Sequence, residues 1–283
     1  MKLPITVLIM ARNEEANIKF AINSVIDDFD QVIVVDSFSE DNTVLICRQY
    51  RGVELYQNKF EGWAEQRNWM LKNCNIRNEI VFFLDADEYL ESNFIKELRG
   101  IIERKVEFSE IILREKFIFL GKHIKYAHAH PPVKRIFKKS SLCFFSEYSG
   151  APREYGIAPK GKAIALDARF IHFDRNPINN WINKHIRYSD AEAAVYLLKK
   201  GKQHKFNRAL LIRTNIKLFT RNHIWDNLPL LIRPFLYFVY RYFLLLGFLD
   251  GKEGLILCYL QAFWYQSMID IKIIELRREK DNE

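Results

Sequence analysis

The stretch Ile80-Val81-Phe82-Phe83-Leu84-Asp85-Ala86-Asp87-Glu88 places three carboxylates directly after a run of apolar residues. A short run of β-branched, aromatic and other apolar side chains is typical of a buried strand. Because the interior of a sheet cannot hold unpaired carboxylates, the acidic residues must lie at its rim. This stretch therefore predicts a buried strand that ends at a polar edge.

Three further apolar runs in the first half predict strands at 5–10, 31–35 and 53–56. The segments around them predict four helices: one capped by Asn13, one from Asp41 or Asn42 to Tyr50, and two at 62–72 and 93–104. Alternating strands and helices indicate a parallel sheet covered on both faces, which binds ligands beyond the carboxyl ends of its strands. That edge carries three polar clusters, at 11–14, 36–37 and 85–87.

The first glycine of the chain is Gly52, so the turn after the first strand contains none. Dinucleotide-binding domains and P-loop enzymes need glycines there, because their backbone approaches phosphate closely. The missing glycines argue against both classes. They also argue against a sugar nucleotidyltransferase, which usually has a glycine-rich loop at this position.

The acidic cluster has the composition of a divalent cation site. Mg²⁺ takes one or two carboxylates and fills its other positions with water and phosphate oxygens, so the cluster predicts a cation bridged to a diphosphate. A solvated turn capped by aspartates is the alternative that the cluster alone leaves open. A haloacid-type phosphatase also has Asp-x-Asp after a strand, but it places a small hydroxyl residue soon afterwards, where this chain has Glu88 and Tyr89.

Four stretches carry a resemblance to a known family: Ala11–Glu15, Val34–Ser37 with Asp41–Thr43, Glu65–Asn68 and Phe83–Glu88. In order and spacing they resemble the family 2 glycosyltransferases of the GT-A fold. Within that family the chain is most similar to the lipopolysaccharide inner-core branch, such as the β-1,4-glucosyltransferases that act on heptose. Segments 132–138, 152–154 and 171–173 and the Arg187-Tyr188 helix carry this second similarity.

The resemblance implies an α/β fold with a GT-A-type, Rossmann-like mixed sheet flanked by helices. It implies a hexosyltransferase that uses a nucleotide-diphosphate sugar, with a UDP-sugar favoured, and Mn²⁺ or Mg²⁺. It also assigns roles by position. Ala11, Asn13 and Glu14 line the nucleotide pocket, and Ala86 is a further nucleotide-sugar-binding residue. Asp36 accepts a hydrogen bond from a uracil-like base, and Arg67 reaches the base or the diphosphate. Asp85 contacts the ribose, and Asp87 ligates the metal.

The family also implies inversion at the sugar, which requires a carboxylate to take the proton of the acceptor hydroxyl. Glu154 is the candidate base, because it lies in a turn-rich segment between Gly150 and Gly156, where functional residues tend to occur. Glu147 is its rival.

Histidines offer further ligands. His172 follows a strand-like stretch at 163–171, and in many GT-A enzymes a histidine after the catalytic region is another metal ligand, which suits Mn²⁺ better than Mg²⁺. A structural histidine beside Phe173 is the alternative. His128 and His130 would share one face of a strand, but the sequence nearby offers no third ligand, which favours an acceptor-side loop over a zinc site.

The remaining residues complete one domain and add a second region. Short strands predicted at 110–114, 117–120, 133–137 and 142–145 would form the acceptor half, 106–175, of a catalytic domain at 1–175 whose nucleotide-sugar half is 1–105. Residues 176–283 would form a helical C-terminal region that begins with a helix at 179–198.

Two apolar stretches of that region, 228–248 and 254–269, have the length of membrane-associated helices. Arg233, Pro234 and Arg241 argue against a simple span, so we expect a hairpin in the membrane interface with snorkelling arginines. The acid-free basic run at 193–225 would attract anionic lipid. Packed core helices or a dimer interface are the alternatives.

The formal net charge of +8 comes without a helix-turn-helix or RNA-binding motif, so no nucleic-acid partner is expected. Four cysteines without CxxC spacing indicate free thiols, and no signal peptide is recognisable. These features predict a cytoplasmic enzyme, peripheral on the inner face of the cell membrane. Its acceptor would be a lipopolysaccharide core, a lipid-linked glycan or another surface glycan. A non-catalytic nucleotide-sugar-binding protein remains the alternative.

Overall fold

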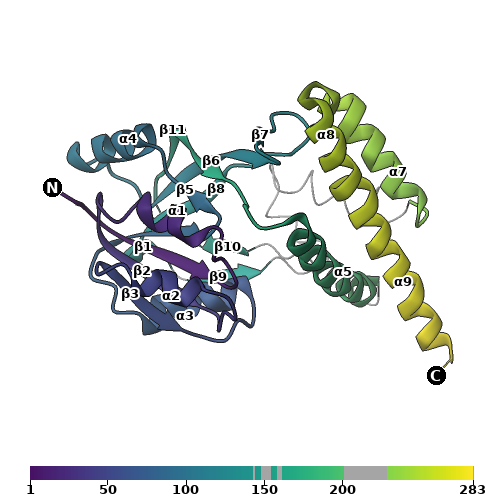
Figure 1. Cartoon of the computed structure of the whole chain (residues 1–283), viewed down its shortest axis with the longest axis horizontal. Coiled ribbons are helices and arrows are strands. Elements are labelled where there is room, and N and C mark those ends of the chain that lie inside the picture. Colours follow the sequence, from purple (N-terminus) through teal and green to yellow (C-terminus); the bar gives the residue numbers. More distant parts are fainter. Residues whose placement is uncertain (143, 148–153, 158–160, 201–227, 283) are drawn as a thin grey trace. The chain divides into compact units, whose positions relative to one another are not determined.

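The apolar runs of the first half lie next to one another in one sheet of the computed structural model, which describes residues 1–142, 144–147, 154–157, 161–200 and 228–282 (Figure 1). The parallel strands follow the order β3 (Val53–Gln57), β2 (Phe29–Asp36), β1 (Leu3–Ala11) and β4 (Ile80–Asp85). The helices that follow these strands are α1 (Ile18–Asn23), α2 (Thr43–Arg48), α3 (Trp63–Asn73) and α4 (Ser92–Glu103).

The sheet continues beyond β4 with mixed strand directions. Next to β4 come β8 (Val133–Lys138), β6 (Glu110–Phe119), β11 (Ala163–His172) and β5 (Glu88–Tyr89). Of these neighbours, only β6 and β11 are parallel. The short strand β7 (Lys122–His123) pairs with β6, and β9 (Phe144–Glu147) pairs with β10 (Glu154–Ile157) in a separate sheet. This mixed sheet with flanking helices confirms the predicted fold class.

Alternate residues of the central strands fill two cores, one on each face of the sheet. In β4, Phe82 and Leu84 join the core that includes α1, α2 and α4, whereas Val81 and Phe83 join the core that includes α3. Successive side chains of a strand point to opposite faces, so a strand that is buried on both faces reads as an uninterrupted apolar run. This explains why β4 reads in the sequence as one continuous apolar run.

Local details differ from the predictions. The N-cap of α1 is Asn17, and Asn13 instead adopts a left-handed backbone with φ 56°, which asparagine tolerates better than most residues. The strands expected at 110–114 and 117–120 are one strand, β6, because Glu115 and Lys116 continue its ladder with β11. The strand expected at 142–145 is β9, which begins two residues later.

The described residues form two compact units: a sheet unit (1–123, 129–142, 144–147, 154–157 and 161–177) and a helical unit (124–128, 178–200 and 228–282). The helical unit contains α5 (Ile178–Lys200), α7 (Ile232–Val239), the π-helical turn η4 (Tyr240–Leu244) and the short helix η5 (Gly247–Asp250). From there α8 (Gly251–Leu257), the π-helical η6 (Cys258–Trp264) and α9 (Tyr265–Asn282) follow one another directly. Ala193 of α5 packs against Ile269 and Ile273 of α9.

Two arginines of α7 and η4 are buried in the helical unit. Arg233 is 2% exposed, and its Nε donates to Asp270 Oδ1 at 2.7 Å. Arg241 donates to the carbonyl of Ala127 and to Gln261 Oε1. The prediction that these arginines snorkel toward a membrane surface is therefore wrong, since each has protein partners inside its own unit. Among the described residues, no helix has both the length and the apolar character needed to cross a membrane.

His185 of α5 gives this fold a pH-dependent stability. Its ring stacks on Trp181 with 3.5 Å between centroids and bonds through Nδ1 to the Trp181 carbonyl, and burial lowers its pKa to about 4. The unfolded chain binds this proton near its ordinary pKa of about 6.5, so the contribution of His185 to stability falls as the pH drops from about 6.5 to about 4. We expect the urea midpoint of His185→Phe to lose less, relative to the wild type, when the pH is lowered from 7 to 4.5. His123→Gln is the control, and an unchanged pH slope in His185→Phe would contradict this account.

Candidate functional site

The carboxyl ends of the parallel strands bring the predicted polar residues to one edge. Ala11 of β1 pairs in register with Asp36 of β2, and Met10 pairs with Asp85 of β4. Asp36 in turn pairs with Gln57 at the end of β3. The structure thus gathers segments that are far apart in the sequence into one row.

The loops after β1 and β2 are locked together by side-chain bonds to backbone. Asn13 Oδ1 accepts from the Glu40 N–H, and the Glu14 N–H donates to Thr43 Oγ1, each at 2.8 Å. The Glu15 N–H donates to Asp41 Oδ2 at 3.0 Å. This network gives a structural reason why the 11–15 and 41–43 stretches occur together.

Asp36 is fully buried at the base of this edge. Its Oδ2 accepts from the Ser39 N–H at 3.0 Å and from Gln57 Nε2 at 3.1 Å. The carboxylate therefore organises the loop after β2 as well as occupying the position predicted for a base-binding residue.

Asp85 lies between two guanidinium groups. Arg67 Nη2 of α3 donates to Oδ1 at 3.0 Å, and Arg135 Nη2 of β8 donates to Oδ2 at 2.6 Å. Burial alone would raise the pKa of Asp85, but Arg135 and Arg67 hold it below its ordinary value. The side chain keeps 32% exposure. An ionised carboxylate with a free edge can still accept a hydrogen bond from a ligand.

Arg67 itself is 2% exposed and lies over the rings of Phe83 and Phe145, at 5.1 and 5.6 Å from their centroids. Its guanidinium is thus held by cation–π contacts as well as by Asp85.

Glu88 and Arg135 form an ion pair next to Asp85. Glu88 Oε1 accepts from Arg135 at 3.1 Å, and Oε2 accepts from the Asp85 N–H at 2.9 Å. Burial raises the pKa of Glu88 to about 7 despite the opposing charge of Arg135. The sequence did not identify Arg135 as a site residue. The signals in the sequence were a basic side chain inside the strand predicted at 133–137 and its place in the segment 132–138 that carries the second similarity.

Asp87 faces a histidine at the end of β11, three strands beyond β4 in the sheet. The register of β11 with β5 places His172 opposite Glu88, and His172 Nε2 lies 3.3 Å from Asp87 Oδ2. On the other side of the ring, Nδ1 lies 3.0 Å from Glu115 Oε2, and Glu115 Oε1 lies 3.4 Å from His130 Nδ1. Glu115 is thus a neighbour of His130 that a local reading of the sequence could not find.

The pair formed by Asp87 and His172 suits a divalent cation. Burial alone would lower the pKa of His172, but Asp87 and Glu115 raise it well above its ordinary value. With Nδ1–H donating to Glu115, a neutral ring would direct the lone pair of Nε2 at the Asp87 carboxylate. That arrangement needs a positive charge between the two, which either a proton or a metal ion supplies. A carboxylate behind a metal-binding histidine is a common supporting arrangement.

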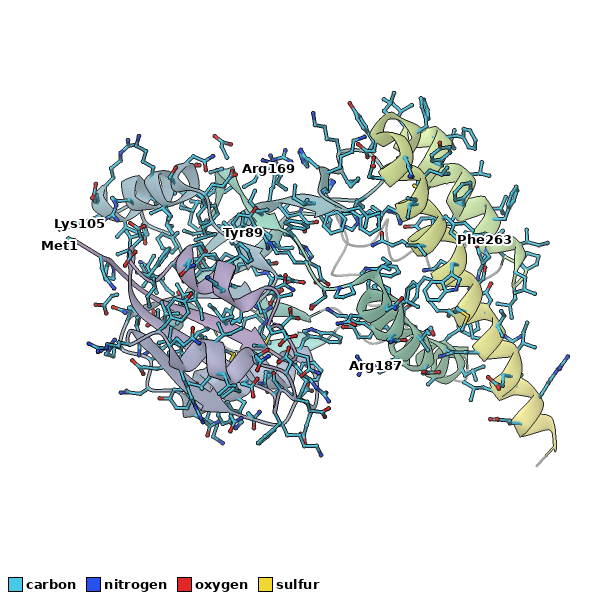
Figure 2. The ribbon with its side chains drawn as sticks, viewed as in Figure 1. Met1, Tyr89, Lys105, Arg169, Arg187 and Phe263 are labelled. Atoms are coloured by element: carbon cyan, nitrogen blue, oxygen red, sulfur yellow. The ribbon has the colours of Figure 1, made fainter. Side chains whose placement is uncertain are left out.

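Asn17 and Arg175 hold the chain that leaves His172. Asn17 Nδ2 donates to Glu14 and to Asp174, and Asn17 Oδ1 accepts from the Arg175 N–H at 2.8 Å. The Arg175 guanidinium lies 3.7 Å from the ring centroid of Phe20 and 5.1 Å from that of Tyr89, which Figure 2 labels. These contacts fix the end of β11 on α1 and β5.

Ala86 is buried between the two aspartates, and its methyl group joins the core of the α1 face. Glu154, the predicted base, lies in β10 and pairs in backbone register with its rival Glu147 in β9. Asn68 of α3 anchors β9, because its side chain donates to the Phe145 carbonyl and accepts from the Phe145 N–H. The two candidate bases are therefore cross-strand partners on β9 and β10. The roles assigned to all these residues stay predictions.

Comparison with known proteins agrees with this architecture. Residues 6–139 match the model of the family described as glycosyl transferase family 2. "Uncharacterized glycosyltransferase RT0209" of Rickettsia typhi is 28% identical over 255 residues, which cover 87% of this chain and 81% of that protein. The lipopolysaccharide core biosynthesis glycosyltransferase LpsC of Rhizobium meliloti is 24% identical over 79% of this chain and 83% of its own length.

A solved structure shares the fold. Staphylococcus aureus TarS 1-349, crystallised with UDP-GlcNAc, is 18% identical, with a TM-score of 0.53 over 99% of this chain and 92% of that one. Residues 6–139 thus form a glycosyl transferase family 2 domain, and the chain is a glycosyltransferase. The predicted family and enzyme class are confirmed.

The Glu115 contact predicts a supporting role in metal binding. Glu115→Gln keeps the shape of the side chain but removes the charge that fixes the His172 ring. We expect it to weaken Mn²⁺ binding about 10- to 100-fold, the usual effect of losing such a partner. Isothermal titration of Mn²⁺ into the protein in the presence of UDP measures this directly. Glu110→Gln, on the same strand and paired with Lys134, is the control. Equal Mn²⁺ affinities for Glu115→Gln and the wild type would rule the role out.

Proposed function

We propose that this glycosyltransferase moves a hexose from a nucleotide-diphosphate sugar, with a UDP-sugar favoured, to a glycan or glycolipid acceptor in a metal-dependent, inverting reaction. The observation that carries the proposal is Asp87 at the rim of the parallel sheet, 3.3 Å from His172 and next to the doubly paired Asp85.

The metal would be held by Asp87 and His172. A bound Mn²⁺ or Mg²⁺ supplies charge that stabilises the departing nucleotide diphosphate. The protein residues orient these ligands: Glu115 holds the histidine ring, and the β5–β11 register holds its backbone.

The donor nucleotide would lie along the row of strand ends. Ala11, Asn13 and Glu14 would line its pocket, in the loop that is locked to Glu40 and Thr43. Asp36 is fully buried, so we propose that it shapes the base-binding end of this row by holding Ser39 and Gln57. Asp85, beside Ala86, would accept from a ribose hydroxyl through its exposed edge. Because Arg67 is 2% exposed, we propose that it acts by holding Asp85 rather than by touching the diphosphate.

The acceptor would be a lipopolysaccharide core, a lipid-linked glycan or another surface glycan, reached by an enzyme that is peripheral on the inner face of the cell membrane. The printed name of LpsC, a lipopolysaccharide core enzyme, supports the first of these. A carboxylate on β10 or β9, Glu154 or its rival Glu147, would take the proton of the acceptor hydroxyl as that oxygen attacks the anomeric carbon.

The metal assignment is tested by donor hydrolysis across a panel of nucleotide sugars with Mn²⁺ or Mg²⁺. We expect Asp87→Ala to lower metal-dependent turnover by about 100-fold or more, because the charge on the leaving diphosphate loses its counterion. Asp27→Ala, an exposed aspartate of the same unit, is the control. If Asp87→Ala kept metal-dependent turnover, the assignment of Asp87 as a metal ligand would be wrong.

The base is tested by transfer rather than hydrolysis, because only transfer deprotonates the acceptor. Glu154→Gln should lower kcat for transfer by about 10²- to 10⁴-fold, the usual contribution of a general base, with the KM of the donor little changed. Glu147→Gln is the matched variant, since the two residues pair in register. If kcat for transfer fell in Glu147→Gln and not in Glu154→Gln, the base would be Glu147. If the double variant kept the wild-type kcat, neither residue would be the base.

A further inference from the structure

Helix α7 and turn η4 turn their apolar side chains outward. Ile232, Phe235, Leu236, Tyr240 and Phe243 are all exposed, at the spacing of one helical stripe. The side chains buried beneath this stripe include Arg233 and Arg241. The usual order of a helix in water is thus reversed.

Specific bonds hold this reversed orientation. Arg233 is paired with Asp270, and Asp270 also accepts from the Leu231 N–H at 2.8 Å. Arg241 reaches the Ala127 carbonyl. Rotating the helix to hide its apolar stripe would break these bonds and leave buried charges without partners, which is strongly destabilising. The outward stripe is therefore a fixed feature of the helical unit.

The exposed apolar surface continues past the turn into the next helix. Leu244 is 71% exposed, and Phe248, Leu249 and Tyr259 are also exposed. We call the exposed apolar side chains of residues 231–259 the apolar face. Contacts join α7 and α8 to η6, so these elements form one body, and Figure 2 shows its side chains with Phe263 of η6 labelled. An exposed patch of this kind on a folded protein marks an interaction surface.

The exposed charges beside the apolar face are mainly basic. Between 229 and 259 the carboxylates are Asp250, which is buried and accepts from the N–H groups of Lys125, Tyr126 and Ala127, and the half-buried Glu253. Lys125 and Lys252 are exposed. In the sequence, an acid-free run rich in lysine and arginine, 193–225, precedes this region. Apolar side chains with a cationic border match an anionic lipid surface.

We propose that the apolar face docks the enzyme on an anionic phospholipid membrane, with the turn at 244–249 entering the interface. The inference rests on the proposed function for its placement at a membrane, and it specifies the partner as the headgroups and outer acyl chains of one leaflet. Docking requires no helix to cross the bilayer. It would present the enzyme to acceptors that are carried on lipid.

Co-sedimentation of the full chain with phosphatidylglycerol–phosphatidylcholine vesicles tests the proposal. Wild-type protein should bind, and binding should fall at least tenfold on pure phosphatidylcholine. The double variant Leu244→Ser/Leu249→Ser should lose at least tenfold in vesicle affinity, because two large apolar side chains no longer enter the interface. The control Leu45→Ser/Leu120→Ser removes two similarly exposed leucines of the sheet unit and should bind as wild type.

Two further experiments test the role of charge and the alternative of self-association. Lys125→Gln/Lys252→Gln should weaken binding to anionic vesicles about tenfold or more and leave neutral vesicles unaffected. The proposal would be overturned if the wild-type protein did not bind vesicles and instead formed a dimer that the Leu244→Ser/Leu249→Ser substitutions dissociate. In that case the apolar face would bind a second copy of this chain. Donor hydrolysis without vesicles separates the two proposals. If the wild-type protein hydrolyses a donor but does not bind vesicles, only the membrane-docking proposal is refuted. If it binds vesicles but hydrolyses no donor in the panel, only the proposed function is refuted.

Discussion

The pairing of Asp85 with two arginines is the interaction on which the site depends. Arg67 comes from the helix after β3, and Arg135 comes from the strand beside β4, so one carboxylate ties a helix and a second strand to the end of β4. A buried arginine without this partner would leave an uncompensated charge in the core. Arg135 also binds Glu88, which places the backbone of the acidic turn. The same bonds therefore stabilise the fold and orient the residues that we propose face the donor.

The strand-and-helix order of the first half could be predicted from the sequence because its signals are local. The run at 80–84 is buried on both faces and reads as continuous apolar sequence, and the polar clusters at 11–14, 36–37 and 85–87 each end a strand. Parallel strands bring such clusters to one edge without further information. The family resemblance was equally local, since its motifs lie in these turns. The domain boundary at 175 stays a prediction.

The residues that the sequence did not reveal are joined by long-range pairing. Arg135 meets Asp85 because β8 runs antiparallel to β4, and Glu115 meets His172 because β6 and β11 are parallel neighbours. Neither contact leaves a spacing that can be read along the chain. The buried arginines of the helical unit were misjudged for the same reason. Arg233 has its partner Asp270 thirty-seven residues away, and a long apolar stretch with arginines looks the same whether they face lipid or protein.

The clamp around Arg175 has a mechanical consequence. Only a few residues separate His172 from the start of α5 at Ile178, the first long helix of the helical unit. Between them, Arg175 is held by Asn17 through its backbone and by the rings of Phe20 and Phe173 through its guanidinium. All of these contacts lie within the sheet unit. The strand end that carries His172 is therefore held in place without any contribution from α5.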